Sequence, residues 1–135
     1  MNKTAEWPLA AQEDVVTVRQ AVRSYAVSMG FTLVDQTKLV TAVSELARNT
    51  VVHGGGGTAR LEVLDEPPRS GLRLIFEDHG PGIADIERAL QDGFTTGTGL
   101  GLGLGGAKRL VNEFAIESRP NVGTKVVITQ WTRRR

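Results

Sequence analysis

The stretch Thr95–Gly106 reads T-T-G-T-G-L-G-L-G-L-G-G and alternates glycine with threonine or leucine over most of its length. Because glycine loses more backbone entropy on folding than other residues, so dense a run predicts a loop and not a helix or strand. The amide N–H groups of such a loop can surround an anion. The next segment, Ala107–Glu113, predicts a helix whose N-terminus adds partial positive charge. Together these features predict a phosphate-binding loop.

Other interpretations of this stretch fit the residues less well. A flexible linker is one alternative, although linkers favour serine and polar residues where this stretch has leucine. Gly101, Gly103 and Gly106 have the dinucleotide-binding spacing G-x-G-x-x-G, which requires a strand directly before it. Residues 92–96, D-G-F-T-T, do not resemble a strand. The Walker pattern G-x-x-x-x-G-K-[ST] also fails, because Ala107 stands where the pattern has lysine.

Composition limits the class of protein. The chain has 135 residues, the size of one domain with a single core, and a net charge of +1. That charge gives no general attraction to nucleic acid or membranes, and Arg133–Arg135 are expected to be a solvated tail. There is no cysteine, so disulfides and thiolate chemistry are excluded. No apolar signal core or transmembrane-length apolar run is present, so we expect a cytoplasmic protein.

Hydrophobic periodicity predicts the elements on both sides of the glycine stretch. Helices are expected over residues 12–29, 33–53, 83–90 and 107–113. Gly30 stands where a C-terminal glycine cap of the first helix would lie, and Thr32 followed by Asp35 resembles a capping box that opens the second. Strands are expected over residues 6–9, 58–64, 72–77, 114–118 and 125–131. Pro8 marks the first strand as an edge strand, and the turn residues 67–71 should join the second and third strands as an antiparallel hairpin.

The helix expected over residues 33–53 has an unusual distribution of polar residues. Its apolar face would be formed by Leu39, Val40, Val43, Leu46, Ala47, Thr50 and Val51. Glu45, Asn49 and His53 lie four residues apart and occupy an arc that borders this face instead of opposing it. Such a row is either an ordinary surface row or the rim of a site, and the helix alone does not decide between them.

A second polar group is expected at a strand end. Asp78 closes the strand over residues 72–77 and is followed by His79-Gly80-Pro81-Gly82-Ile83. A strand that delivers a carboxylate into a tight Gly-Pro-Gly bend holds that carboxylate in one position.

Four separated segments now form a recognisable series. They are E-L-A-R-N-T-V-V-H-G (45–54), D-H-G-P-G-I (78–83), T-G-T-G-L-G-L-G-L (96–104) and G-T (123–124). In this order they resemble the N box, G1 box, G2 box and final Gly-Thr of the GHKL, or Bergerat-fold, ATPase superfamily. The chain's small size and the run G-A-K-R-L-V-N-E-F (106–114) further resemble the bacterial partner-switching serine kinases of the RsbT, RsbW and SpoIIAB type, and RsbT most of all.

The resemblance implies a single domain over residues 1–135 with the Bergerat ATP-binding fold. That fold is an α/β two-layer sandwich: a mixed, mostly antiparallel sheet with helices on one face. It also implies a site for ATP and Mg²⁺, in which Asn49 is the metal ligand and Glu45 the general base. Asp78 would accept a hydrogen bond from the adenine amino group. The nucleotide-binding residues implied by motif position are Asn49, His53, Asp78, Gly80, Gly82, Ile83, Thr98, Gly99, Leu100, Gly101, Leu102, Gly103 and Thr124.

The activity implied by the resemblance is that of an ATP-dependent serine/threonine kinase acting on a STAS-domain antagonist protein in a partner-switching stress or sigma-factor pathway. One alternative is an anti-sigma factor that sequesters a sigma subunit. Another is a nucleotide-sensing interaction module without transfer activity, against which Glu45 argues because a binder needs no base. A sigma factor or a downstream phosphatase are further possible partners. No nucleic-acid or membrane partner is expected, and the oligomeric state is left open.

Overall fold

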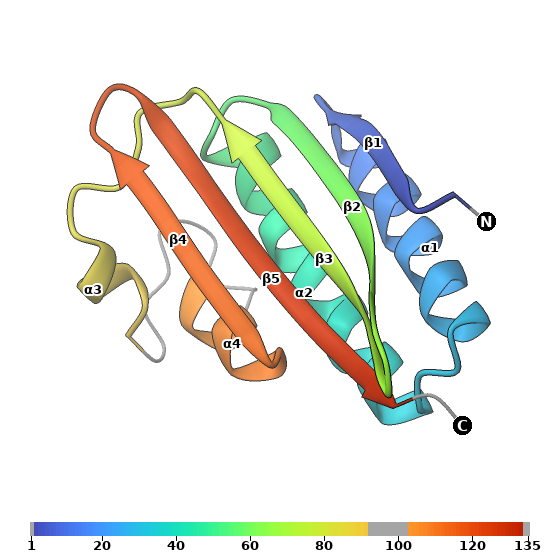
Figure 1. Ribbon diagram of the computed structural model, residues 1–135. Coiled ribbons are helices and arrows are strands. Elements are labelled where there is room, and N and C mark those ends of the chain that lie inside the picture. The colour runs from blue at the N-terminus through green and yellow to red at the C-terminus, as the bar shows by residue number, and fades with distance from the viewer. Residues whose placement is uncertain (1, 92–102, 134–135) are drawn as a thin grey trace.

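The computed structural model describes residues 2–91 and 103–133. A five-stranded sheet of order β1-β2-β3-β5-β4 carries α1, α2 and α4 on one face (Figure 1). The strands are β1 (Thr4–Leu9), β2 (Gly57–Glu66), β3 (Arg69–Asp78), β4 (Glu113–Arg119) and β5 (Gly123–Arg133). The helices are α1 (Gln12–Ser28), α2 (Leu33–Val52), α3 (Ile86–Ala89) and α4 (Gly103–Leu110). The prediction of a two-layer α/β sandwich is confirmed.

Every pair of neighbouring strands in the described residues is antiparallel. This finding corrects the expectation of a mixed sheet. The connections explain this result. β2–β3 and β4–β5 are joined by short turns, which can link only antiparallel strands. β1 and β2 are separated by α1 and α2, and the chain reverses at each of the three connections between these four elements, so β1 and β2 also run in opposite directions.

The core lies between the sheet and the helices. On α2 the buried residues are Leu39, Val40, Ala42, Val43, Leu46, Ala47 and Thr50. They agree with the predicted face except that Ala42 is added and Val51 is only half-buried. Alternate residues of β3, Leu72, Leu74 and Phe76, point to the same core. At about 25 cal/mol per Å² of apolar surface, this shared burial is the main force that holds α2 against the sheet.

The ends of α1 and α2 follow local rules read from the sequence. Thr32 caps α2, because its Oγ1 accepts the N–H of Asp35 at 3.1 Å. Gly30 has a φ of 83° just after α1, the left-handed conformation that glycine adopts most easily. Asp14 accepts the N–H groups of Ala10 and Ala11 at the start of α1. Both helices therefore lie within a residue or two of their expected bounds.

The helix after the glycine stretch differs from the prediction. α4 begins at Gly103 and ends at Leu110, so Gly103, Gly105 and Gly106 belong to a helix that the composition had assigned to a loop. Packing explains the exception. A β-carbon on Gly105 would lie 2.2 Å from the Leu90 carbonyl oxygen, so only glycine allows α4 to approach this close. Glu113, expected at the helix end, is the first residue of β4.

The predicted strands are shorter than the observed strands, and one predicted helix is longer than the observed helix. The five strands all extend beyond the predicted ranges except at the end of β1, and β5 includes the Gly123-Thr124 pair. Backbone pairing extends each hairpin up to its turn, whatever the polarity of the side chains. The helix predicted over residues 83–90 is only Ile86–Ala89, which Asp85 caps through the N–H of Arg88.

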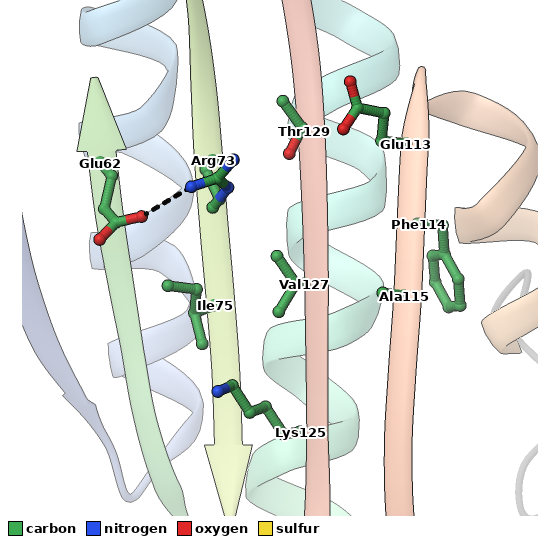
Figure 2. Close-up of a pocket in the computed structure, with 9 residues that line it drawn as sticks. All are labelled: Glu62, Arg73, Ile75, Glu113, Phe114, Ala115, Lys125, Val127 and Thr129. Atoms are coloured by element: carbon green, nitrogen blue, oxygen red, sulfur yellow. Dashed lines mark hydrogen bonds and ion pairs between the residues drawn. The ribbon is translucent and has the colours of Figure 1, made fainter. Parts of the chain in front are cut away.

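The opposite face of the sheet carries no helix in the described part of the chain. A hollow of about 500 Å³ lies on this face, and Arg73 of β3 pairs there with Glu62 of β2 at 3.4 Å. Figure 2 shows the side chains that line it. The hollow is lined by Glu62, Arg73, Ile75, Glu113, Phe114, Ala115, Lys125, Val127 and Thr129. None of these is a predicted site residue. Asp78, by contrast, points to the same face as the buried Leu72, Leu74 and Phe76, so the candidate site lies on the helix-covered face.

Candidate functional site

α2 presents the first part of the candidate site along its border with the core. Glu45 and Asn49 lie one turn apart, and both are half-buried beside buried neighbours such as Leu46. This half-burial confirms that the two residues border the apolar face of the helix, and their membership of a site stays a prediction. His53 is the exposed C-cap of the same helix, and its N–H donates to the Asn49 carbonyl at 2.9 Å.

The carboxylate of Glu45 is held by its own helix. Arg48 donates from Nη1 to Oε1 of Glu45 at 2.9 Å, and the Glu45 side chain is only 12% exposed against 44% for Arg48. In the described residues no partner engages the second oxygen, Oε2. Glu45 is therefore a fixed carboxylate with one acceptor oxygen still available.

Asp78 ends β3 and is 8% exposed. Its Oδ1 accepts the N–H of Gly80 at 2.9 Å. Glycines surround it: a β-carbon on Gly54 would lie 2.4 Å from the Asp78 γ-carbon, and one on Gly123 would lie 2.2 Å from the Asp78 carbonyl oxygen. Asp78 is therefore a buried carboxylate fixed by backbone that approaches it from three segments.

The N box and the G1 box meet at this carboxylate. The N–H of Gly54 donates to the Asn49 carbonyl at 3.0 Å, and Gly54 in turn lies against Asp78. A β-carbon on Gly80 would lie 2.5 Å from the Gly54 carbonyl oxygen, so the two glycine-containing segments also touch. The structure thus places the residue that follows α2 and His53, Gly54, directly against Asp78 at the end of β3.

A row of polar side chains continues from Asp78 across the sheet. Thr124 of β5 is directly opposite Asp78 of β3, and Ser118 of β4 is directly opposite Thr124. Directly opposite residues of antiparallel strands point to the same face, here the helix-covered one. The hydroxyl oxygens of Ser118 and Thr124 lie 2.8 Å apart.

The loop after Asp78 is fixed to the β4–β5 turn. The N–H of Ile83 donates to Ser118 Oγ at 2.7 Å, and the N–H of Asn121 donates to the Pro81 carbonyl at 2.7 Å. Gly82 has a φ of 74°, and a β-carbon there would lie 2.2 Å from the Arg119 carbonyl oxygen. Gly80, Gly82 and Ile83 therefore line one side of the site in a fixed conformation.

Sequence reasoning did not include two residues of this arrangement. Gly54 closes the N-box pattern, so its position beside His53 was a signal that could have identified it. Ser118 belongs to none of the four motifs. Only the register of the β4–β5 hairpin, which pairs it with Thr124, reveals its place.

The remaining predicted residues belong to the glycine stretch. Thr98, Gly99, Leu100, Gly101 and Leu102 lie outside the described residues. Gly103 is the first residue of α4, with a φ of 70°. Within residues 2–91 and 103–133 there is no group of three or more histidine, aspartate or glutamate side chains that could hold a metal ion by themselves.

The fold and this site define the class of protein. The sequence profile described as "Histidine kinase-, DNA gyrase B-, and HSP90-like ATPase" matches residues 34–134. The chain belongs to this family, and the resemblance inferred from the four motifs is confirmed. None of the helices in the described part of the chain has the length and apolar character needed to span a membrane.

Two individual proteins are similar to this chain over most of their length. The serine/threonine-protein kinase RsbT of Bacillus subtilis (strain 168) is 41% identical over 133 residues, which cover 98% of this chain and 100% of RsbT. An anti-sigma F factor of Thermoanaerobacter sp. (strain X514) is 30% identical over 128 residues, 91% of this chain and 89% of that protein. The higher identity to RsbT agrees with the predicted subgroup.

Solved structures confirm the fold. The RsbU and RsbW domains of a Mycobacterium tuberculosis protein match with a TM-score of 0.64 at 20% identity, over 99% of this chain and 34% of that one. This chain thus spans about a third of that structure. A mycobacterial sensor histidine kinase, MprB, matches with a TM-score of 0.54 at 19% identity, over 97% of this chain and 100% of that one.

Proposed function

We propose that the protein is an ATP- and Mg²⁺-dependent serine/threonine kinase that phosphorylates a small STAS-domain protein in a partner-switching pathway. The observation that carries this proposal is the meeting of α2 and β3, where Gly54 joins Asn49 to the buried Asp78. A base-reading carboxylate and a rim of polar side chains thereby share one site. The 41% identity to RsbT supports the kinase assignment.

Asp78 is suited to read the base. Adenine carries an exocyclic amino group that donates hydrogen bonds, whereas guanine has a carbonyl oxygen at that position. Oδ2 of Asp78, for which the described residues supply no hydrogen-bond donor, can accept from an amino group and repels a carbonyl oxygen. Because glycines hold the carboxylate in place, it cannot turn away from an unsuitable base without a backbone shift. We therefore propose ATP as the nucleotide.

Glu45 and Asn49 are suited to the phosphate end. Phosphoryl transfer depends mainly on positioning and on neutralising charge. Oε2 of Glu45, which has no partner among the described residues, can accept the proton of a serine or threonine hydroxyl as that hydroxyl attacks the terminal phosphate and ADP leaves. Arg48 keeps the carboxylate oriented through the other oxygen.

Asn49 is suited to bind the Mg²⁺ ion that accompanies ATP. Mg²⁺ usually keeps several waters and takes only one or two protein ligands, most often carboxylates, together with substrate phosphates. The side-chain amide oxygen of Asn49 would be the protein ligand here. When bound, Mg²⁺ would supply neutralising charge at the phosphates.

The protein partners follow from the relatives and not from the site geometry. A STAS-domain substrate fits the RsbT-like assignment, and such a switch operates in the cytoplasm. Because an anti-sigma F factor is 30% identical, sequestration of a sigma subunit is the second candidate function. A downstream phosphatase is a further candidate partner of the same switch.

Calorimetric titration with ATP and GTP, each with and without Mg²⁺, tests the nucleotide part of the proposal. We expect Mg²⁺-dependent binding of ATP and exclusion of GTP. Transfer of labelled phosphate from ATP to candidate STAS-domain proteins then tests the kinase activity. Binding of ATP without transfer to any of them, together with capture of a sigma subunit, would favour the anti-sigma function. If neither nucleotide binds, the kinase proposal fails and a protein-interaction module is the function that remains.

A further inference from the structure

Ser118 of β4 contacts three groups at the base end of the candidate site, although it belongs to none of the sequence motifs. Its Oγ receives the N–H of Ile83 at 2.7 Å and lies 3.2 Å from the Gly123 carbonyl oxygen. The same Oγ is 2.8 Å from Oγ1 of Thr124. A serine hydroxyl has a single proton, so these contacts determine one another's direction.

Counting the protons assigns each bond. The Ile83 N–H can only donate, so Ser118 accepts at that contact. The Gly123 carbonyl can only accept, so the Ser118 hydroxyl donates to it. The Ser118 proton is then in use, and the short contact with Thr124 must be a bond that the Thr124 hydroxyl donates. This is the one arrangement in which all three hydrogen bonds form together.

The arrangement fixes the chemical character of Thr124. With its proton committed to Ser118, Thr124 offers only lone pairs to the site. Asp78, directly opposite on β3, also offers only lone pairs from its carboxylate. Two neighbouring acceptors suit an amino group, which has two protons to donate, and they repel a carbonyl oxygen.

We propose that Ser118 is a positioning residue that sets the hydrogen-bond polarity of Thr124 and thereby helps the site to select a 6-amino purine over a 6-keto purine. This inference rests on the proposed nucleotide binding at the same site. Asp78 supplies a fixed charge, while Ser118 prevents Thr124 from turning its proton toward a carbonyl group. Without Ser118 the Thr124 hydroxyl could rotate and serve either base.

Titration of the Ser118→Ala variant with ATP and with ITP, both with Mg²⁺, tests this role. ITP has a carbonyl group where ATP has the amino group. We expect the ratio of ATP affinity to ITP affinity to fall about fivefold or more, the usual effect of one buried hydrogen bond. If Ser118 had only a structural role, the substitution would weaken the binding of both nucleotides equally and leave the ratio of the two affinities unchanged.

A double-mutant cycle shows whether Ser118 acts through Thr124. Thr124→Val removes the hydroxyl and keeps the shape. In that background, Ser118→Ala should leave the ratio of ATP to ITP affinity unchanged. A change of ratio that persists without the Thr124 hydroxyl would overturn the proposal.

Two further variants complete the experiment. Ser70→Ala removes another buried serine hydroxyl, at the opposite end of β3 from Asp78, and should not change the ratio. Ser118→Cys replaces the hydroxyl with a slightly larger thiol, a much weaker hydrogen-bonding group, and is used if the Ser118→Ala variant does not fold. An unchanged ratio in the folded Ser118 variant overturns the proposal. If the unsubstituted protein binds neither nucleotide, the proposed nucleotide function fails and this inference fails with it.

Discussion

Gly54 lies so close to Asp78 that a β-carbon at position 54 would come within 2.4 Å of the Asp78 γ-carbon. The two residues are far apart in sequence, at the end of α2 and the end of β3. Their contact joins the helix that carries Glu45 and Asn49 to the carboxylate that we propose reads the base. The glycine is therefore required by the site and not only by the turn.

Replacing Gly54 with alanine should displace the Asp78 carboxylate and lower ATP affinity at least tenfold, because the nearest atoms belong to a buried side chain with little room to move. Calorimetric titration with ATP measures the effect. Gly30→Ala is the control: Gly30 has a φ of 83° with nothing within 4 Å of an added β-carbon, so that variant should lose stability but keep ATP affinity. Equal ATP affinity in both variants would contradict the role given to Gly54.

Asp78→Asn keeps the shape of the side chain and removes its charge. We expect ATP affinity to fall about tenfold to a hundredfold, because a hydrogen bond to a charged acceptor is lost and an amide N–H₂ can face the base amino group. Asp65→Asn, a change of an exposed carboxylate near the β2–β3 turn, should have no such effect. Unchanged ATP affinity in Asp78→Asn would remove this residue from the base pocket.

Glu45→Gln should preserve ATP affinity and slow phosphotransfer by about a hundredfold or more, because the amide cannot accept the substrate proton. The two quantities are measured separately, by titration with ATP and by transfer of labelled phosphate to the protein substrate. Glu66→Gln breaks a comparable pair with Arg69, 3.2 Å long, at the far end of the hairpin and should change neither. Loss of binding and transfer together in Glu45→Gln would rule out the general-base assignment.

Thr32→Ala removes the N-cap of α2 and should lower the free energy of unfolding by about 1 kcal/mol, with a fall in Tm of roughly 4 °C. Thermal unfolding followed by circular dichroism measures this change. Thr37→Ala, an exposed position within the same helix, should shift Tm much less, because its hydroxyl only donates back to the Leu33 carbonyl. A Tm for Thr32→Ala that matches the unsubstituted protein would show that the cap contributes little.

Several features could be read from the sequence because they depend on neighbouring residues. The helix of Glu45 and Asn49 follows from apolar periodicity, and its start follows from the Thr32 cap. The place of Asp78 at the end of a strand was predictable because a strand pattern leads directly into a Gly-Pro-Gly bend. The order of the motifs was enough to predict the family, which the match over residues 34–134 confirms.

Other features depended on contacts that local rules do not contain. The start of α4 at Gly103 was missed because composition measures the entropy cost of glycine and not the space that Gly105 leaves for the Leu90 carbonyl. The strand ends were missed because backbone pairing across a hairpin continues past the hydrophobic pattern.

The sequence by itself therefore determined the elements, the motifs and the family, since periodicity, capping and motif spacing act over a few residues. Only the tertiary structure decided that Gly54 closes on Asp78 and that Ser118 shares a hydroxyl contact with Thr124. The physical reason is that each of these contacts is set by close packing or strand register between separate segments. No residue's local conformational preference encodes such a contact.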